Sequence, residues 1–251
     1  MLFRKINSRL FDKPLPEMPG GKLLINTINA YSYIMAKENE AFQQAIKDSS
    51  ILLPDGVGIT LAARLLDGKM VRKIAGEDLF YWQLNRLDMQ NGKCFFLGSS
   101  RHVLGKIERR LKAEYPNVQA AFYSPPYKKM FTEDESEEMI NAVNAFKPDV
   151  LFIGMTAPKQ ETWAHQYFHR IHAMHVCSIG AVFDFFAGTV SRSPRWMVKL
   201  GLEWLYRLVK EPRRLWKRYL IGNTLFVLEL LGARVSRMFG SRRKAVHPYQ
   251  Y

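Results

Sequence analysis

The chain has 251 residues, of which 47% are hydrophobic and 24% are charged. This composition is typical of a globular protein that is long enough to bury a sizeable core. There are only two cysteines, Cys94 and Cys177, which excludes a disulfide framework and a cysteine-rich zinc site. Each lies in an apolar run, so we expect buried free thiols in a reducing compartment. No apolar core follows the basic residues near Met1, and we expect no signal peptide.

The net charge of +14 is concentrated toward the C-terminal end. Residues 192–251 hold 14 Lys and Arg against 3 Asp and Glu, whereas residues 1–191 hold 23 against 20. A strongly basic segment indicates an acidic partner: nucleic acid, an anionic membrane surface or a phosphorylated substrate. We therefore divide the chain into a nearly neutral core domain, residues 1–191, and a basic C-terminal appendage, residues 192–251.

The core domain alternates short apolar runs with longer helical patterns. Residues 1–21 contain three prolines and a Gly-Gly pair, and we expect them to be irregular. Strands are expected at residues 22–28, 50–53, 94–97, 120–123, 148–154 and 176–180. Helices are expected at residues 31–46, 59–66, 76–89, 103–114, 133–146 and 158–170. This alternation predicts an α/β fold with a mostly parallel sheet flanked by helices.

The appendage has a different pattern. We expect two helices, at residues 196–210 and 212–239, rich in Arg, Trp, Leu and Tyr. The most apolar stretch, residues 219–231, is shorter than the roughly 20 residues of a spanning helix, and Asn223 and Glu229 interrupt it. With basic residues on both sides, it is typical of an amphipathic helix lying on an anionic membrane. The alternative is a helix that docks on the core domain or on a second subunit.

The stretch around Asp55 joins a strand pattern to a helix pattern through a sharp turn. Pro54 fixes its own φ, while Gly56 and Gly58 permit a positive φ and close approach of a ligand. Ligands of open α/β sheets bind at the carboxyl ends of the strands, where this turn is expected. Asp55 can therefore cap the following helix, or it can act as a base.

A second turn of interest is Gly98-Ser99-Ser100, which follows an apolar strand pattern and precedes a helix pattern. Small, hydroxyl-bearing residues at a helix N-terminus can hold a phosphate through backbone N–H groups. They can equally form an ordinary helix cap, and the residues alone leave both readings open.

The sequence offers little support for a bound metal. His165, His169 and His172 share one face of an expected helix, but no Glu follows His165 as an H-E-x-x-H motif requires. No Asp-x-Asp pair is present to hold a divalent ion on a diphosphate, and the phosphate-binding P-loop and dinucleotide motifs are also absent. We predict no metal and no cofactor.

Three arginines of the appendage, Arg207, Arg214 and Arg218, are spaced seven and four residues apart, close to helical spacing. Converging guanidinium groups can bind a diphosphate bidentately and neutralise it as a metal ion would. The alternative is charge matching to lipid or nucleic acid.

Seven stretches, in order, resemble the WecG/TagA/CpsF family of bacterial glycosyltransferases, also called glycosyltransferase family 26. The resemblance extends over roughly residues 22–220. The most specific segments are Pro-Asp-Gly at 54–56, Pro-Lys-Gln-Glu at 158–161 and Gly-Leu-Glu-Trp-Leu-Tyr-Arg at 201–207. The others lie at residues 25–29, 74–79, 96–100 and 183–188.

The resemblance implies a Rossmann-like core whose site is completed by the C-terminal appendage. It also implies an inverting, metal-independent transfer of a sugar from a UDP donor to a polyprenyl-diphosphate-linked acceptor, for cell-surface polysaccharide synthesis. The sugar would be N-acetylmannosamine, its uronic acid or glucose. The protein would be a peripheral one on the cytoplasmic face of the inner membrane.

The resemblance also implies roles for individual residues. Asp55 would be the base, and the arginines Arg207, Arg214 and Arg218 would act on the diphosphate. The substrate-binding residues would be Thr27, Asn29, Lys73, Gly98, Ser99, Lys159 and Gln160. Relatives tend to have Arg at the position of Lys73, and Lys keeps the charge but loses the planar fork.

Two other classes of protein are compatible with parts of the sequence. A non-enzymatic membrane- or nucleic-acid-binding module would explain the basic appendage, although the nearly neutral core domain argues against nucleic acid. A nicotinamide-dependent oxidoreductase would require the dinucleotide motif, which is missing. A homo-oligomer is compatible with every reading.

Overall fold

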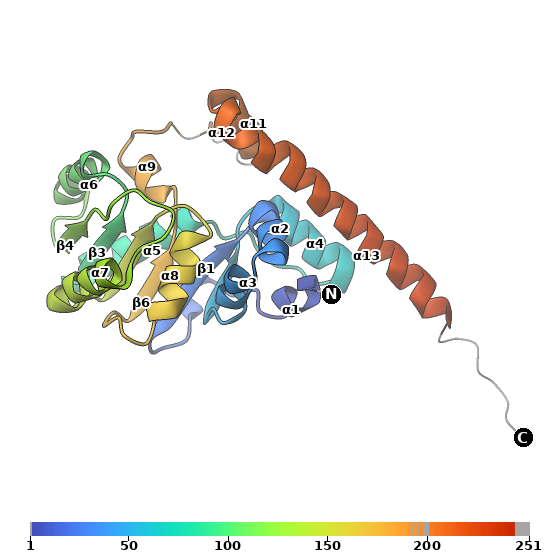
Figure 1. Ribbon diagram of the computed structural model, residues 1–251, viewed down its shortest axis with the longest axis horizontal. Coiled ribbons are helices and arrows are strands. Elements are labelled where there is room, and N and C mark those ends of the chain that lie inside the picture. Colours follow the sequence, from blue (N-terminus) through green and yellow to red (C-terminus); the bar gives the residue numbers. More distant parts are fainter. Residues whose placement is uncertain (1, 192, 195, 198–200, 244–251) are drawn as a thin grey trace, which may run out of the picture.

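The computed structural model describes residues 2–191, 193–194, 196–197 and 201–243. Its centre is a six-stranded, all-parallel sheet in the order β2-β1-β6-β5-β3-β4 (Figure 1). The predicted fold class, α/β with a Rossmann-like parallel sheet and a helical C-terminal appendage, is confirmed. The strands are β1 (Leu23–Ile28), β2 (Ile51–Pro54), β3 (Lys93–Gly98), β4 (Gln119–Tyr123), β5 (Val150–Gly154) and β6 (His175–Ser178).

Helices cover both faces of the sheet, because successive strand residues point to opposite faces and both sets are apolar. Cys94 and Phe96 of β3 pack in a cluster with α5, α6 and α9. Phe95 and Leu97 pack in a second cluster with α7 and α8. These helices are α5 (Gly76–Gln90), α6 (Arg101–Glu114), α7 (Glu133–Phe146), α8 (Lys159–Tyr167) and α9 (Val182–Phe186).

A third hydrophobic cluster lies at the β2 edge of the sheet and combines α1–α4 with the last helix of the chain. The four N-terminal helices are α1 (Leu2–Asn7), α2 (Ala30–Glu38), α3 (Glu40–Lys47) and α4 (Val57–Asp67). The expectation of an irregular segment at residues 1–21 is wrong for α1 and for the short 3₁₀ helix η1 (Leu15–Glu17). Phe3 and Ile6 are fully buried, so tertiary packing stabilises a helix too short to be stable alone.

The helix expected at residues 31–46 is two helices, because Asn39 ends α2 and caps α3. The Asn39 side-chain oxygen accepts a hydrogen bond from the backbone N–H of Phe42 at 2.8 Å. This cap satisfies a donor that the helix itself leaves without a partner. The short helix α9 was not expected from the sequence, since its apolar run also resembles a strand.

The appendage is more broken than expected. The helix expected at residues 196–210 is interrupted at Gly201, whose φ of +72° is left-handed, and α11 begins only at Glu203. The elements that follow are α11 (Glu203–Lys210), α12 (Pro212–Trp216), the π-helical segment η2 (Lys217–Gly222) and α13 (Asn223–Arg243). Among the described residues, no helix combines the length and apolarity needed to span a bilayer.

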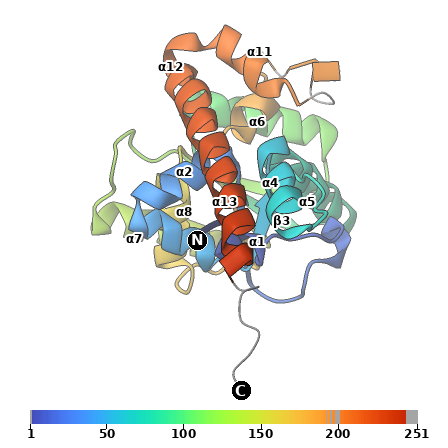
Figure 2. The same cartoon turned by 90° about the vertical axis from the view of Figure 1, so that its right-hand side faces the viewer.

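The long helix α13 lies against the core domain, across α2 and α4 (Figure 2). Phe226 and Leu230 are buried in the third cluster, and the Phe226 ring meets Tyr33 edge-on at 5.4 Å between centroids. The Tyr33 hydroxyl donates to Glu229 Oε1 at 2.8 Å, and Lys37 forms an ion pair with the same carboxylate. One face of α13 is therefore docked on the core domain, as the alternative reading of the sequence has it, while its other faces are exposed.

Candidate active site

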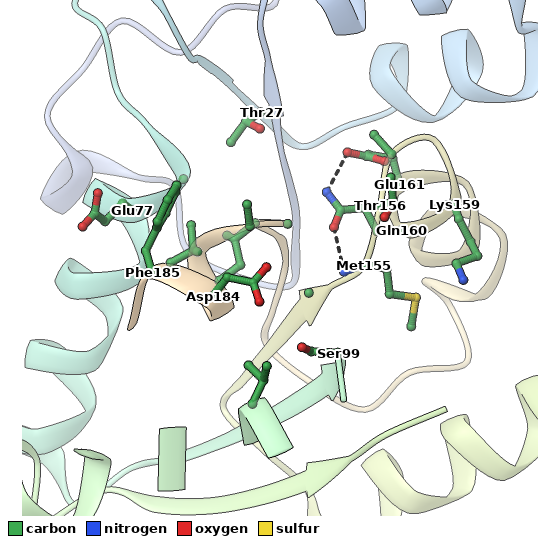
Figure 3. Close-up of a pocket in the computed structure, with 18 of the residues that line it drawn as sticks. Thr27, Glu77, Ser99, Met155, Thr156, Lys159, Gln160, Glu161, Asp184 and Phe185 are labelled. Carbon is green, nitrogen blue, oxygen red and sulfur yellow. Dashed lines mark hydrogen bonds between the residues drawn. The ribbon is translucent and has the colours of Figure 1, made fainter. Parts of the chain in front are cut away.

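A cavity of about 810 Å³ opens at the carboxyl edge of the sheet, beneath the appendage. Its walls come from the ends of β1, β2, β3, β5 and β6, together with α11 and the segment that follows it. This is the edge at which open α/β sheets bind their ligands. Thr27 of β1, Ser99 after β3, Gln160 at the start of α8 and Asp184 of α9 all line it (Figure 3).

The cavity brings together residues that are far apart in the sequence. Eight of the eleven residues singled out from the sequence line it: Thr27, Asn29, Asp55, Ser99, Lys159, Gln160, Arg207 and Arg218. Lys73 lies beside the cavity instead of in its wall, and Gly98 precedes the lining residue Ser99. Arg214 belongs to α12, but its side chain lies outside the part of the chain that the structure describes.

Asp55 directly follows β2 and is held by the backbone. Its N–H donates to the carbonyl oxygen of Ile28 at 2.8 Å, which continues the pairing of β2 with β1. Gly56 then turns the chain with a φ of +103°, a conformation that disfavours residues with a Cβ. The turn therefore aims Asp55 into the cavity, while α4 receives no side-chain cap.

The surroundings of Asp55 raise the pKa of its carboxyl from the usual 3.8 to about 6. The main cause is burial, which disfavours the charged form, and the nearby Glu203 carboxylate acts in the same direction. Lys73 and Arg218 oppose this shift through their positive charges. A carboxyl with a pKa near the working pH suits a general base.

Lys73 forms an ion pair with Glu203 at 3.8 Å between Nζ and Oε2. Both side chains are partly buried, and Glu203 lines the cavity at the start of α11. The pair therefore links the connector after α4 to the helix that carries Arg207. Placed in this way, Lys73 acts on the charge around Asp55 and on the position of α11.

Gln160 and Glu161 form a buried pair at the start of α8 (Figure 3). The Gln160 side-chain oxygen accepts from the Met155 N–H at 3.1 Å, which leaves its amide to donate to Glu161 Oε1 at 2.8 Å. Glu161 Oε2 is buried and has no hydrogen-bond partner among the described residues. Burial raises the pKa of Glu161 to about 7, against the opposing influence of Gln160 and Arg218.

Asn29 and Ser99 lie at turns after β1 and β3. The Asn29 side-chain oxygen accepts from the Ser32 N–H at 3.0 Å, so it is a helix cap as well as a cavity residue. After β3 the cap is Ser100, whose Oγ accepts from the Val103 N–H at 3.3 Å. Ser99 has a left-handed φ of +61° and is left free to face the cavity.

Packing explains why position 98 is a glycine. A Cβ at this position would lie 2.5 Å from the carbonyl oxygen of Gly154 on the neighbouring strand β5. Its φ of +115° also disfavours any other residue. Gly98 is thus required by the close approach of two strand ends next to the cavity.

Two appendage arginines enter the cavity wall against aromatic rings. The Arg207 guanidinium lies 5.3 Å from the Phe185 ring centroid, and the Arg218 guanidinium lies 5.3 Å from the Tyr31 centroid. The Nε atoms of both arginines are buried and have no hydrogen-bond partner among the described residues. Buried guanidinium N–H groups without partners are suited to bind an anion.

Lys159 is more constrained than its motif suggested. Its ammonium group donates to the Lys128 carbonyl oxygen at 2.7 Å and lies 4.5 Å from the Phe131 ring centroid. Part of the side chain still lines the cavity (Figure 3).

Several lining residues were not singled out from the sequence. The acidic ones are Glu77, Glu161, Asp184 and Glu203, and the others include Arg101 and Tyr127. All four acidic residues lie inside the motifs, at 74–79, 158–161, 183–188 and 201–207, but the motifs gave no reason to separate them from helix-surface residues. Their burial at the cavity is set by tertiary contacts.

The prediction that His165, His169 and His172 share one helix face is wrong, because α8 ends at Tyr167 and only His165 lies on it. His165 Nε2 lies 2.9 Å from Asp48 Oδ2 at the surface. Across the residues that the structure describes, no three His, Cys, Asp or Glu side chains gather in a way that could hold an ion.

The structure is thus an α/β fold with a cavity at the carboxyl edge of a parallel sheet, lined in part by arginines of the appendage. The chain belongs to the glycosyl transferase WecG/TagA/CpsF family, whose match spans residues 13–239. The resemblance seen in the sequence motifs is thereby confirmed.

Curated relatives point the same way. The chain is 32% identical to a protein of Bacillus spizizenii (strain ATCC 23059 / NRRL B-14472 / W23), with 78% of this chain and 74% of the relative covered. It is also 32% identical to a protein of Bacillus subtilis (strain 168), with 78% of this chain and 75% of the relative covered. A Staphylococcus aureus (strain MW2) relative is 29% identical, covering 78% and 74%. All three are named N-acetylglucosaminyldiphosphoundecaprenol N-acetyl-beta-D-mannosaminyltransferase.

Proposed function

We propose that this protein transfers a sugar from a UDP donor to a polyprenyl-diphosphate-linked acceptor, with inversion at the anomeric carbon. The names of the relatives favour N-acetylmannosamine as the sugar and an N-acetylglucosaminyl-diphosphate lipid as the acceptor. The uronic acid of N-acetylmannosamine and glucose are the alternative donor sugars. The observation that carries the proposal is one cavity that contains both a carboxyl of raised pKa, Asp55, and two half-buried arginines, Arg207 and Arg218, whose Nε atoms have no hydrogen-bond partner among the described residues.

Asp55 is the proposed base. The acceptor hydroxyl must lose a proton as it attacks the anomeric carbon, and a carboxylate on the acceptor side can take it. General-base assistance is typically worth about 10²–10⁴-fold in rate. Attack from the side opposite the departing UDP inverts the configuration, so Asp55 and the diphosphate would lie on opposite sides of the sugar.

Arg207 and Arg218 are the proposed partners of the diphosphate, and Arg214 remains a third candidate. As the bond to the donor sugar breaks, the departing UDP gains negative charge, which fixed guanidinium groups can stabilise. We propose that this arrangement replaces a divalent metal ion. Thr27, Asn29, Ser99 and Gln160 would hold the two sugars and the donor nucleotide.

We also propose that the basic appendage brings the protein to the cytoplasmic face of the membrane, where a lipid-linked acceptor is found. Arg213 and Lys217 are exposed on α12 and η2, beside the exposed apolar side chains of Trp216 and Ile221. Cations next to apolar side chains favour an anionic membrane surface.

The decisive experiment measures sugar transfer from a panel of UDP-sugars to a synthetic polyprenyl-diphosphate-linked N-acetylglucosamine in detergent. Acceptor-dependent transfer from one donor, unchanged by EDTA and lost in Asp55→Asn, is the expected result. Transfer that survives Asp55→Asn would move the base to another residue, and loss of transfer in EDTA would contradict the metal-free mechanism. If no donor–acceptor pair reacts, the non-enzymatic binding module becomes the better reading.

A further inference from the structure

The helices α4 and α13 run side by side and contact each other (Figure 2). We call the line along which they meet the seam. At one end a Cβ at Gly58 would lie 3.4 Å from the Phe226 ring. Further along, Arg234 Nη1 donates to the carbonyl oxygen of Leu65 at 3.4 Å. Gly58 therefore lies next to Phe226, and Leu65 lies next to Arg234. Because the residue numbers rise together along both helices, α4 and α13 run in the same direction over about two turns.

Exposed apolar side chains border this seam on the α4 side. Val57, Leu61 and Leu65 are four residues apart and form one stripe, and they are 50%, 48% and 43% exposed. The residues of α4 that face the core, Ile59 and Ala62 among them, are fully buried. The stripe is therefore additional to the packing of the helix.

The α13 side of the seam is apolar as well. Glu229 contacts α2 on one flank of α13, and Arg234 contacts α4 on the other. Val227 and Leu231 precede Arg234 by seven and three residues, so they lie on the α4 flank. They are 50% and 56% exposed.

The seam begins next to the candidate active site. Val57 is two residues after Asp55, and a Cβ at Gly201, just before α11, would lie 2.9 Å from Val57 Cγ2. Arg218, whose charge acts on Asp55, lines the cavity at the same end. The cationic end of the cavity and the apolar stripe are therefore neighbours.

We propose that this seam, defined by Val57, Leu61, Leu65, Val227 and Leu231, binds the first isoprene units of the acceptor's polyprenyl chain. The inference rests on the proposed function, because it needs an acceptor whose sugar lies at Asp55. The acceptor's own diphosphate, which is separate from the UDP diphosphate assigned to Arg207 and Arg218, would then lie at the end of the cavity near Val57 and Lys73, and the chain attached to it would continue along the seam. Cationic side chains would thus meet the anionic diphosphate, and apolar side chains would meet the hydrocarbon chain.

A flat bilayer contact would engage α13 differently from a bound chain. Leu228 and Val235 point away from the core domain, half a turn or so from the buried Phe226, and are 58% and 50% exposed. A bilayer lying on α13 would use these residues at least as much as Leu231. Leu228→Ser is thus a matched control for Leu231→Ser.

The test uses the full-length protein in detergent and acceptors with one, three and eleven isoprene units on the same sugar diphosphate. In the wild type, kcat/KM should rise with chain length. In Leu61→Ser/Leu231→Ser, it should fall about tenfold or more for the longer acceptors and stay unchanged for the shortest. Leu228→Ser should match the wild type, and all variants should unfold at similar temperatures because the altered residues are exposed.

A second readout does not depend on turnover. A farnesyl diphosphate carrying a terminal diazirine should label peptides containing residues 57–65 and 223–235 on irradiation, and excess unlabelled farnesyl diphosphate should suppress the labelling. If the wild type transfers sugar to no acceptor but this labelling occurs, the proposed function fails and the seam stands.

Three results would overturn the seam. The first is labelling confined to other parts of the chain. The second is a wild type that transfers sugar equally well to short and long acceptors, or a Leu61→Ser/Leu231→Ser variant that keeps the wild-type preference for long acceptors. The third is a double variant that no longer sediments with phosphatidylglycerol vesicles but keeps the wild-type kcat/KM for every acceptor. A Leu228→Ser variant whose kcat/KM for long acceptors falls as much as that of the double variant would have the same meaning, since either result would make this face a bilayer contact.

Discussion

At the scale of single residues, the candidate site depends on opposing influences on one carboxyl. Burial and Glu203 raise the pKa of Asp55, while Lys73 and Arg218 lower it, and the result is a value of about 6. Lys73 provides one of the two positive charges that oppose the raised pKa. Its partner is Glu203 of the appendage, so a charge from each part of the chain acts on the proposed base.

The pH dependence of transfer should reflect Asp55. Because the pKa is raised, the carboxyl is protonated below about pH 6 and cannot accept the proton of the acceptor hydroxyl. We expect kcat/KM to fall tenfold per pH unit below about 6 and to level off above it. A profile that stays flat down to pH 4.5 would contradict Asp55 as the base.

The fall of kcat/KM at low pH is the acid limb of the pH profile. Two substitutions beside Asp55 should move this limb in opposite directions. Lys73→Gln removes a positive charge that favours the carboxylate, so the limb should shift to higher pH. Glu203→Gln removes a negative charge that disfavours it, so the limb should shift to lower pH. The pH profile of kcat/KM for each variant checks this, and Lys106→Gln, on α6, serves as the control. Shifts of the same sign in both variants would mean that the pair acts only on the position of α11.

At the scale of elements, α13 is held to α2 by a polar contact inside an apolar cluster. The fully buried Tyr33 donates to Glu229, and both Tyr33 and Phe226 contact Phe3 of α1. Gly222, just before α13, allows the chain to lie on Tyr31, since a Cβ there would be 2.8 Å from that ring. Tyr31 is also the ring beside Arg218, so the docking of α13 places this arginine in the cavity wall.

Breaking this contact should affect both stability and transfer. Glu229→Ala leaves the O–H of the buried Tyr33 without its acceptor, and we expect a loss of about 1–3 kcal/mol in the free energy of unfolding. Transfer should fall as well, because α13 and η2 hold Arg218. Denaturant unfolding and kcat/KM test the two effects, and Glu229→Gln, which keeps an acceptor oxygen, should restore most of both. Equal loss in Gln and Ala would show that the charge, and not the hydrogen bond, holds α13.

At the scale of the whole molecule, the appendage contributes to the site and to the core at once. It provides Arg207 and Arg218 to the cavity, and it covers Phe3 and Tyr33 through Phe226 and Leu230. A complete cavity therefore requires the appendage to be docked. If docking is favoured at a membrane, transfer would be coupled to the location of the lipid-linked acceptor.

Removing the appendage should abolish transfer even to a water-soluble acceptor analogue. A chain ending at residue 191 lacks both arginines, and removal of such charge-stabilising groups typically costs about 10²–10³-fold each. Because this chain also exposes part of its core, full-length Arg207→Ala/Arg218→Ala provides the comparison that keeps α13 docked. Full activity of the truncated chain would contradict a role of the appendage in the site.

Local patterns in the sequence were sufficient for the sheet, and together with the family resemblance they named eight residues that line the cavity. Short apolar runs ending in Asp55, Ser99 and the motif at 158–161 predicted the strands and the edge at which these residues meet. This works because side-chain alternation and turn residues are local properties, and parallel strands necessarily place their carboxyl ends together. The family followed from the order of seven such segments.

Only the tertiary structure decided where the appendage lies and what surrounds the carboxyls. The residues of α13 gave no means of choosing between a membrane and the core domain, since Phe226 and Leu228 are equally apolar and only one of them is buried. The same holds for α1, which forms because Phe3 is enclosed by distant residues, and for the buried pair of Gln160 and Glu161. Burial and pKa depend on residues far apart in the chain, so they become defined only when packing brings those residues together.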